Sequence, residues 1–131
     1  MKTGAEAMSD QDSLALLARF AAAWNAHDVD ALLDFMTDDG VFHASAGPGP
    51  FGATAVGREA LRRAYADVWK TYPDAQWTNA IHFASGDRAF SEWLFTGTKA
   101  DGTRVEVRGC DLFTLRGGKI AVKNSFRKQV V

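Results

Sequence analysis

The hydrophobic pattern of the chain changes its period near residue 75, and this change constrains the fold more than any other feature. Before it, apolar side chains recur every three or four residues, as they do on one face of a helix. After it, apolar and polar side chains alternate, as they do along a half-buried strand. The alternating part predicts four strands, because dipeptides typical of tight hairpin turns separate its apolar runs. The strands are Gln76–Ser85, Arg88–Lys99, Arg104–Leu115 and Ile120–Val130, and the turns are Gly86-Asp87, Asp101-Gly102 and Gly117-Gly118.

The first half of the chain predicts three helices. Ser9 and Asp12 resemble a capping box, in which side-chain oxygens bind the unpaired amides of a first helical turn. Asp28 can cap a second, shorter helix in a similar way. The third helix spans Arg58–Tyr72 and is ended by Pro73, which cannot continue it.

Helices followed by an antiparallel meander predict an α+β fold in which the helices pack on one face of a curved sheet. Such an arrangement encloses one pocket between the sheet and the helices. Residues 41–46 add a short strand, and the Gly- and Pro-rich residues 46–56 predict a rim loop that holds neither a helix nor a paired strand. We treat residues 1–131 as a single domain, with residues 1–10 as a disordered tail.

Composition and charge narrow the function classes. The chain has 131 residues and a formal net charge of −1, with its basic residues scattered among acids, so we expect neither nucleic acid nor a membrane as a partner. Cys110 is the only cysteine and the three histidines are well separated, so we expect no metal site. The glycine-rich loop lacks the ending of a phosphate cradle, and we expect no cofactor. No spanning helix or secretory signal is visible, which predicts a cytoplasmic protein.

Asp111 is the one charged residue on the apolar face of the third predicted strand. The residues that alternate with it are Val105, Val107, Gly109, Phe113 and Leu115. Because this face is otherwise apolar, we expect it to line the interior. A carboxylate in an apolar wall suits proton transfer. The alternative is that Asp111 pairs with a neighbouring Arg or Lys and only stabilises the sheet.

The neighbouring strands supply further candidates. Glu92 is a second acid that could act as a base or neutralise a pocket cation. His82 could be an acid/base partner, or a sheet histidine that only hydrogen-bonds its surroundings. Both faces of the strand that carries Glu92 are apolar, which favours a second subunit over the convex face of the sheet, with Trp77 and Trp93 in the interface. We therefore expect a homodimer.

Several short segments, in this order and at this spacing, carry a family resemblance that covers about residues 14–128. They are Trp24–Leu33, Asp38-Asp39, Gly57, Gly109–Phe113 and Gly118–Ile120. The chain resembles the SnoaL-like branch of the nuclear transport factor two-like superfamily, which includes ketosteroid isomerases, polyketide cyclases and limonene epoxide hydrolases. This resemblance implies a cone-shaped fold with a deep pocket and, usually, a homodimer through the convex sheet face. It also places Asp111 where family members carry a pocket carboxylate.

Two positions depart from the isomerase pattern. In an ungapped register, the isomerase's tyrosine falls on Phe20 and its general-base aspartate falls on Ala44. Phe20 has no hydroxyl to polarise a carbonyl, and Ala44 has no base to take a proton. We therefore do not expect ketosteroid isomerase activity.

The resemblance also orients the meander strands around the pocket. The residues that it turns toward the cavity are Glu92, Leu94, Thr96, Lys123, Ser125 and Arg127, joined by Gln76, Thr78 and His82 if the first meander strand has no bulge. The predicted catalytic residues are Asp111, Glu92 and His82. The predicted ligand-binding residues are Arg127, Lys123, Ser125, Phe20, Trp24 and Trp69.

Two functions are consistent with this predicted site. The first is a cofactor-independent isomerase, cyclase or hydrolase of a small apolar carbonyl-type molecule, with Asp111 as acid/base and Arg127 or Lys123 binding an anionic oxygen. The second is a non-catalytic ligand-binding or dimeric interaction module of the same fold, in which Asp111 and Arg127 form a closed pair. A ligand-sized cavity with both groups unpaired would favour the first function, and a sealed pair would favour the second.

Overall fold

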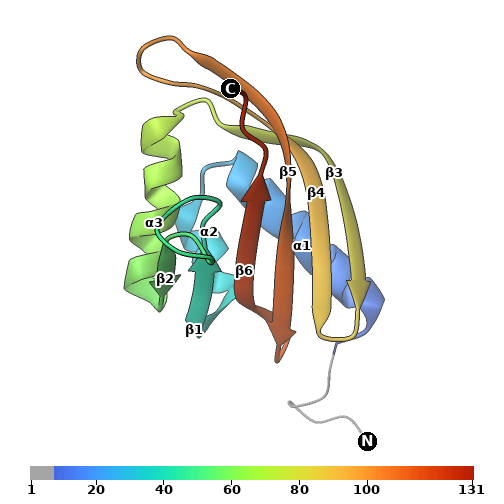
Figure 1. Cartoon of the computed structure of the whole chain (residues 1–131). Coiled ribbons are helices and arrows are strands. Elements are labelled where there is room, and N and C mark those ends of the chain that lie inside the picture. Colours follow the sequence, from blue (N-terminus) through green and yellow to red (C-terminus); the bar gives the residue numbers. More distant parts are fainter. Residues whose placement is uncertain (1–7) are drawn as a thin grey trace, which may run out of the picture.

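Three helices lie against one face of a bent sheet in the computed structural model, which describes residues 8–131 (Figure 1). The elements are α1 (Asp10–Asn25), α2 (Val29–Asp34), β1 (Met36–His43), β2 (Thr54–Val56), α3 (Arg58–Thr71), β3 (Gln76–Ser85), β4 (Arg88–Thr98), β5 (Arg104–Arg116) and β6 (Lys119–Arg127). This architecture confirms the predicted α+β fold class. Residues 1–7 of the predicted tail lie outside the described residues, and Asp10 already belongs to α1. No helix within residues 8–131 combines the length and the apolar character needed to cross a membrane.

The six strands form one open sheet in the order β2-β1-β6-β5-β4-β3. The four meander strands pair antiparallel, as predicted, whereas β6 pairs parallel with β1. β2 was not expected, because residues 46–56 were predicted to hold no paired strand. Its residues 54–56 pair antiparallel with β1 through Val41, Phe42 and His43. The glycines and prolines precede this segment, so they shape the loop without interrupting the pairing.

α1 and α2 begin after the capping residues that the sequence predicts. The Ser9 hydroxyl accepts a hydrogen bond from the Asp12 amide at 3.0 Å, and the Asp28 carboxylate accepts one from the Ala31 amide at 3.1 Å. His27 separates the two helices in a left-handed conformation with φ 57°. Its Nε2 lies 2.8 Å from the Ala75 carbonyl oxygen, which fixes the junction against the segment that leads into β3.

Strand pairing sets which side chains face the helices, and it corrects part of the prediction. Asp111 pairs with Ser91 across β4 and β5, so Ser91 faces inward, and Glu92 faces outward with its partner Cys110. The inward placement of Glu92 was therefore wrong, as were those of Leu94 and Thr96, which share its face. Both faces of β4 carry apolar residues, so alternation alone gave no indication of the inner face.

A bulge in β3 changes the face of its first residues. The register shifts between Thr78 and Ile81, and Asn79 within the shift has φ 56°. The extra residue places both Trp77 and His82 on the inner face, opposite Phe95 and Ser91. Gln76 and Thr78 are exposed, because they lie on the other side of the bulge from His82. The outward placement of Trp77 and Trp93 in a subunit interface was also wrong, since both pack into the core.

The end of α1 is joined to the edge strand β3 by one asparagine side chain. Asn25 Nδ2 donates to the Trp77 carbonyl oxygen at 2.9 Å, and its Oδ1 accepts from the Trp77 amide at 2.7 Å. β3 pairs with β4 on one side only, so its outer edge has backbone groups that the sheet leaves unpaired. The Asn25 amide group takes the place of a neighbouring strand at this point.

We predict that Asn25→Ala lowers the free energy of unfolding by about 1–3 kcal/mol, because it leaves the partly buried Trp77 amide and carbonyl without partners. Urea unfolding monitored by circular dichroism measures the change. Asn124→Ala, on the outer face of β6, is the matched control, and we expect it to cost less than about 0.5 kcal/mol. Equal stability losses in the two variants would contradict the role of Asn25.

Candidate functional site

Four polar residues stand side by side across the inner face of the sheet. His82 of β3 pairs with Ser91 of β4, Ser91 pairs with Asp111 of β5, and Asp111 pairs with Ser125 of β6. Directly opposed residues project from the same face, so the four side chains form one row among apolar neighbours. Lys123 lies on the same face of β6, two residues before Ser125.

Asp111 is buried, with 6% of its surface exposed, and three donors surround its carboxylate. Trp93 Nε1 donates to Oδ2 at 2.9 Å. Ser125 Oγ donates to Oδ1 at 2.5 Å, and Lys123 Nζ lies 3.2 Å from the same oxygen. The partner of Asp111 is therefore Lys123, not Arg127 as the non-catalytic alternative predicted.

Lys123 has 8% of its side chain exposed and makes contacts suited to a buried cation. Its Nζ donates to Ser125 Oγ at 2.7 Å. The ammonium also lies 4.7 Å from the centre of the Phe42 ring and 5.1 Å from that of Trp24, within range of cation–π attraction. Burial lowers the pKa of Lys123 from its ordinary value, and the Asp111 carboxylate opposes this shift. Ser125 is the link in this cluster, since it accepts from the ammonium and donates to the carboxylate.

Gly109 makes room for the indole that reaches Asp111. It pairs with Trp93 across β4 and β5, and a Cβ on Gly109 would overlap the outer edge of the Trp93 ring. The glycine therefore lets the large ring lie flat over the backbone, with its Nε1 directed at the carboxylate. Trp93 was not among the predicted site residues.

A cavity of about 480 Å³ opens beside this cluster, which is large enough for a small organic ligand. Its wall is formed by α3, β6 and the segments around β2, together with aromatic side chains from β3 and β4. The aromatic residues that line it are Trp24, Phe42, Tyr72, Trp77 and Trp93, and the polar residues include Lys123, Ser125 and Arg127. Asp111 does not line this cavity, so Lys123 and Ser125 stand between the carboxylate and the space for a ligand.

A second cavity of about 30 Å³ lies on the other side of the cluster. Asp111, His82 and Ser91 line it, and Lys123 and Trp93 line both cavities. His82 Nδ1 lies 2.7 Å from Ser91 Oγ. The space is large enough for a water molecule, and it is polar on the side of the row.

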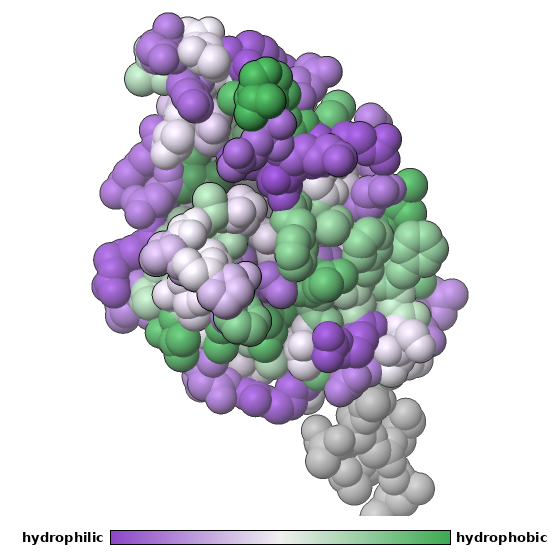
Figure 2. Space-filling model, in the orientation of Figure 1, coloured by the Kyte–Doolittle hydropathy of each residue, from purple (hydrophilic) through white to green (hydrophobic). Residues whose placement is uncertain are grey.

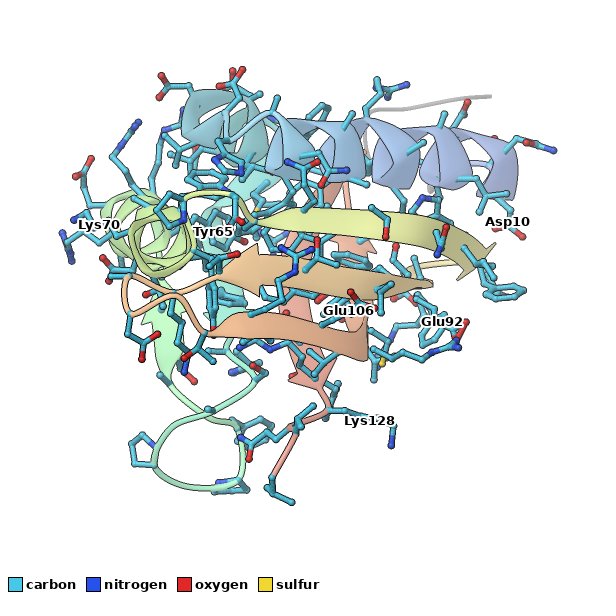
Figure 3. All side chains as sticks on the ribbon, turned by 90° about the horizontal axis from the view of Figure 1, so that it is seen from above. Asp10, Tyr65, Lys70, Glu92, Glu106 and Lys128 are labelled. Atoms are coloured by element: carbon cyan, nitrogen blue, oxygen red, sulfur yellow. The ribbon has the colours of Figure 1, made fainter. Side chains whose placement is uncertain are left out.

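The remaining predicted residues fall into different places. Phe20 lines the smaller cavity and packs against Phe113 at 5.9 Å between ring centres. Trp69 lines neither cavity and stacks on His27 at 5.1 Å. Glu92 lies on the side of the sheet away from α1, where its carboxylate is 3.3 Å from Arg108 (Figure 3). Its location excludes it from both cavities.

Counting outward from a turn would have identified Ser91 and Trp93. The hairpin around Asp101-Gly102 brings Thr98 opposite Arg104, and an unbroken register from there places Ser91 opposite Asp111. The same count places Trp93 opposite Gly109, and a glycine facing a large aromatic residue indicates close approach of the ring to the backbone. Among residues 8–131, no three His, Cys, Asp or Glu side chains come together as a metal site requires.

We predict that His82 titrates below its ordinary value of 6.5, because burial lowers its pKa. The folded state then favours neutral His82, so its contribution to stability is complete above pH 6.5 and is lost as the pH falls through the folded pKa. The wild type should lose more unfolding free energy than His82→Gln between about pH 7.5 and about pH 5, by urea unfolding. NMR titration of the ring protons, assigned with the same variant, gives the midpoint. A midpoint at or above 6.5 would show that burial does not control this imidazole.

Comparisons with known proteins agree with this architecture. Among solved structures, the chain is similar to a proposed polyketide cyclase from Xanthomonas campestris, with 23% identity, a TM-score of 0.79, and coverage of 89% of this chain and 90% of that one. It is also similar to a hypothetical protein of ketosteroid isomerase-like fold from Catenulispora acidiphila, solved with trimethylamine, with 24% identity, a TM-score of 0.75, and coverage of 85% and 83%. A protein of unknown function from Mesorhizobium loti, described as NTF2-like, has 27% identity, a TM-score of 0.74, and coverage of 92% and 93%. No functionally curated protein matches the chain.

The model of one protein family covers most of the chain. It describes the SnoaL-like domain and matches residues 17–123, which extend from the second turn of α1 onward, through β5, to Lys123 in β6. The structural neighbours share the fold of this superfamily along nearly their whole length. The chain therefore belongs to the SnoaL-like family.

Proposed function

We propose that the protein is a cofactor-independent acid–base enzyme, an isomerase, cyclase or hydrolase, that acts on a small apolar molecule with a carbonyl-type group. The observation that carries this proposal is the Asp111–Ser125–Lys123 cluster at the wall of a cavity of about 480 Å³ lined with aromatic side chains. The aromatic lining suits a flat apolar body. The two cavity-facing polar groups suit an oxygen on that body.

The arrangement of donors and acceptor gives each residue a role. Lys123 lines the cavity and can donate a hydrogen bond to a carbonyl oxygen, which favours the negative charge that develops when a neighbouring proton leaves. Ser125 also lines the cavity, but its one hydroxyl hydrogen is donated to Asp111. Asp111 lies behind them and exchanges protons with the cavity through the Ser125 hydroxyl. Asp111 thus remains the proposed acid/base, but it acts through Ser125, whereas Glu92 has no part. His82 and Ser91 approach the carboxylate from the side of the smaller cavity.

One observation favours the second function, a non-catalytic ligand-binding module. All three polar neighbours of Asp111 are hydrogen-bonding or ion-pairing groups of the chain itself, at 2.5 to 3.2 Å. A carboxylate held in this way can have a purely structural role, which is to keep Lys123 and Ser125 in position. The two functions predict the same ligand and differ in whether the ligand is converted.

We predict that Asp111→Asn and Ser125→Ala each reduce turnover of the substrate by about 10²–10⁴-fold. Compounds are first found by quenching of tryptophan fluorescence, using a panel of small aryl ketones and esters, because three tryptophans line the cavity. Conversion of each bound compound is then followed by mass spectrometry. Glu92→Gln is the matched control, since it makes the same acid-to-amide change on the outer face and should keep full turnover.

The outcomes separate the two functions. Full turnover by folded Ser125→Ala and Asp111→Asn would refute the acid–base assignment. Binding without conversion of any panel compound by the wild type would favour the ligand-binding module. Circular dichroism confirms folding, and Ser125→Ala preserves both buried charges if Asp111→Asn unfolds the protein.

We also propose that the protein is a homodimer through the outer face of the sheet. Large apolar side chains are exposed there on β3, β5 and β6, namely Ile81 at 49%, Phe83 at 60%, Leu112 at 39% and Phe126 at 49%. Figure 2 shows hydrophobic residues gathered over this part of the sheet. Apolar patches of this kind on a soluble domain favour a second copy as a cover.

We predict that Phe83→Glu and Phe126→Glu shift the protein to monomer, because each places a charge in the apolar patch. Light scattering at micromolar concentration measures the mass. Val56→Glu, at a residue that is also 60% exposed but lies on β2 at the far edge of the sheet, should leave the mass unchanged. A monomeric wild type would rule out the dimer.

A further inference from the structure

The charges that line the larger cavity do not balance. Its two cations are Lys123 and Arg127, and Lys123 is paired with Asp111 behind the wall. The one acid on the lining, Asp67, is 69% exposed and lies 3.6 Å from Lys70. Within residues 8–131, no carboxylate lies within 4.0 Å of the Arg127 guanidinium. Arg127 is thus an uncompensated positive charge at the cavity.

Two aromatic rings hold the Arg127 guanidinium in place. Its central carbon lies 4.6 Å from the centre of the Phe95 ring and 5.8 Å from that of Tyr72. Both rings are buried, with Phe95 0% and Tyr72 8% exposed, so they form a rigid support. These cation–π contacts hold the guanidinium without using a hydrogen-bond acceptor. None of its N–H donors binds an acceptor within the described residues.

The strand that carries Arg127 places it on the same face as the acid–base cluster. Arg127 and Ser125 project from the same face of β6, where their partners are Gly109 and Asp111. Two residues along a strand span roughly 6.5–7 Å. The two residues therefore attach to the same wall of the cavity, one strand repeat apart.

We propose that the cavity binds a small aromatic or apolar carboxylic acid, whose carboxylate pairs with Arg127. A planar guanidinium with free N–H donors matches a carboxylate in a two-point hydrogen-bonded pair. The apolar body of the acid lies among Trp24, Trp77 and Trp93. A second oxygen on the same body reaches the Lys123 ammonium, which lines the same cavity. Only this last contact rests on the proposed function, because the pairing of Arg127 with an anion does not depend on any chemistry that follows.

The test compares an acid with its neutral amide. The probes are 4-oxo-4-phenylbutanoate, which carries a carboxylate and a ketone on one aromatic body, and 4-oxo-4-phenylbutanamide. Binding is measured by tryptophan fluorescence with the full chain. The wild type should bind the acid at least about tenfold more tightly than the amide, with the preference falling as salt is added.

The variants assign this preference to one side chain. Arg127→Gln should abolish the preference for the acid while leaving the affinity for the amide unchanged. Arg127→Lys keeps the charge without the planar pair of donors and should retain part of the preference. Arg108→Gln, on the outer face and paired with Glu92, is the matched control and should behave as the wild type.

Each outcome bears on the proposal. Equal binding of acid and amide by the wild type, or no binding of the acid at millimolar concentration, would overturn it. A preference that survives in folded Arg127→Gln would overturn it as well, and Arg127→Lys serves if the glutamine variant unfolds. This test measures binding alone and does not use turnover. Failure of the acid–base function would leave the acid preference intact, and absence of the preference would leave the acid–base function open to its own test.

Discussion

The ion pair between Asp111 and Lys123 is the constraint on which the rest of this structure depends. Each charge alone would be costly to bury, and the pair is tolerated only because further hydrogen bonds satisfy both groups. Ser125 bridges them, and Trp93 binds the second carboxylate oxygen. Trp93 in turn requires a glycine opposite it. One buried charge pair thus determines residues on three strands and the register in which those strands pair.

The pair also explains the division of the interior into two spaces. Asp111 lines the smaller space with His82 and Ser91, Ser125 lines the larger one, and Lys123 lines both. A ligand in the larger cavity meets the Lys123 ammonium and the Ser125 hydroxyl, and reaches the Asp111 carboxylate only through Ser125. The ammonium favours oxygen-bearing ligands over amines, because it donates hydrogen bonds and cannot accept them.

The helices and strands were predicted well from the sequence. The inward-facing side was predicted correctly for some strands and wrongly for others. Asp111 was placed correctly because its strand has one apolar face, so alternation gave one answer. Glu92 was misplaced because β4 is apolar on both faces, and only the pairing with β5 decides between them. His82 faces inward, but the bulge at Asn79 means that it does so together with Trp77 rather than with Thr78. A bulge adds one residue without changing the composition of a strand, so the alternation pattern cannot locate it.

The parallel pairing of β6 with β1 has a consequence for how the site comes into existence. Lys123 and Ser125 belong to the last strand, which lies between β1 and β5, and Lys123 pairs with Phe42 on one side and Phe113 on the other. The contact between Lys123 and Phe42 joins residues that are far apart in sequence, so forming it costs the chain entropy of closing a long loop. In a partly folded form in which β6 is not paired, the Lys123 ammonium, the Ser125 hydroxyl and Arg127 are not in place at the site. A ligand bound at this site therefore stabilises the complete sheet rather than a local part of it, and its occupancy reports that the whole chain has folded.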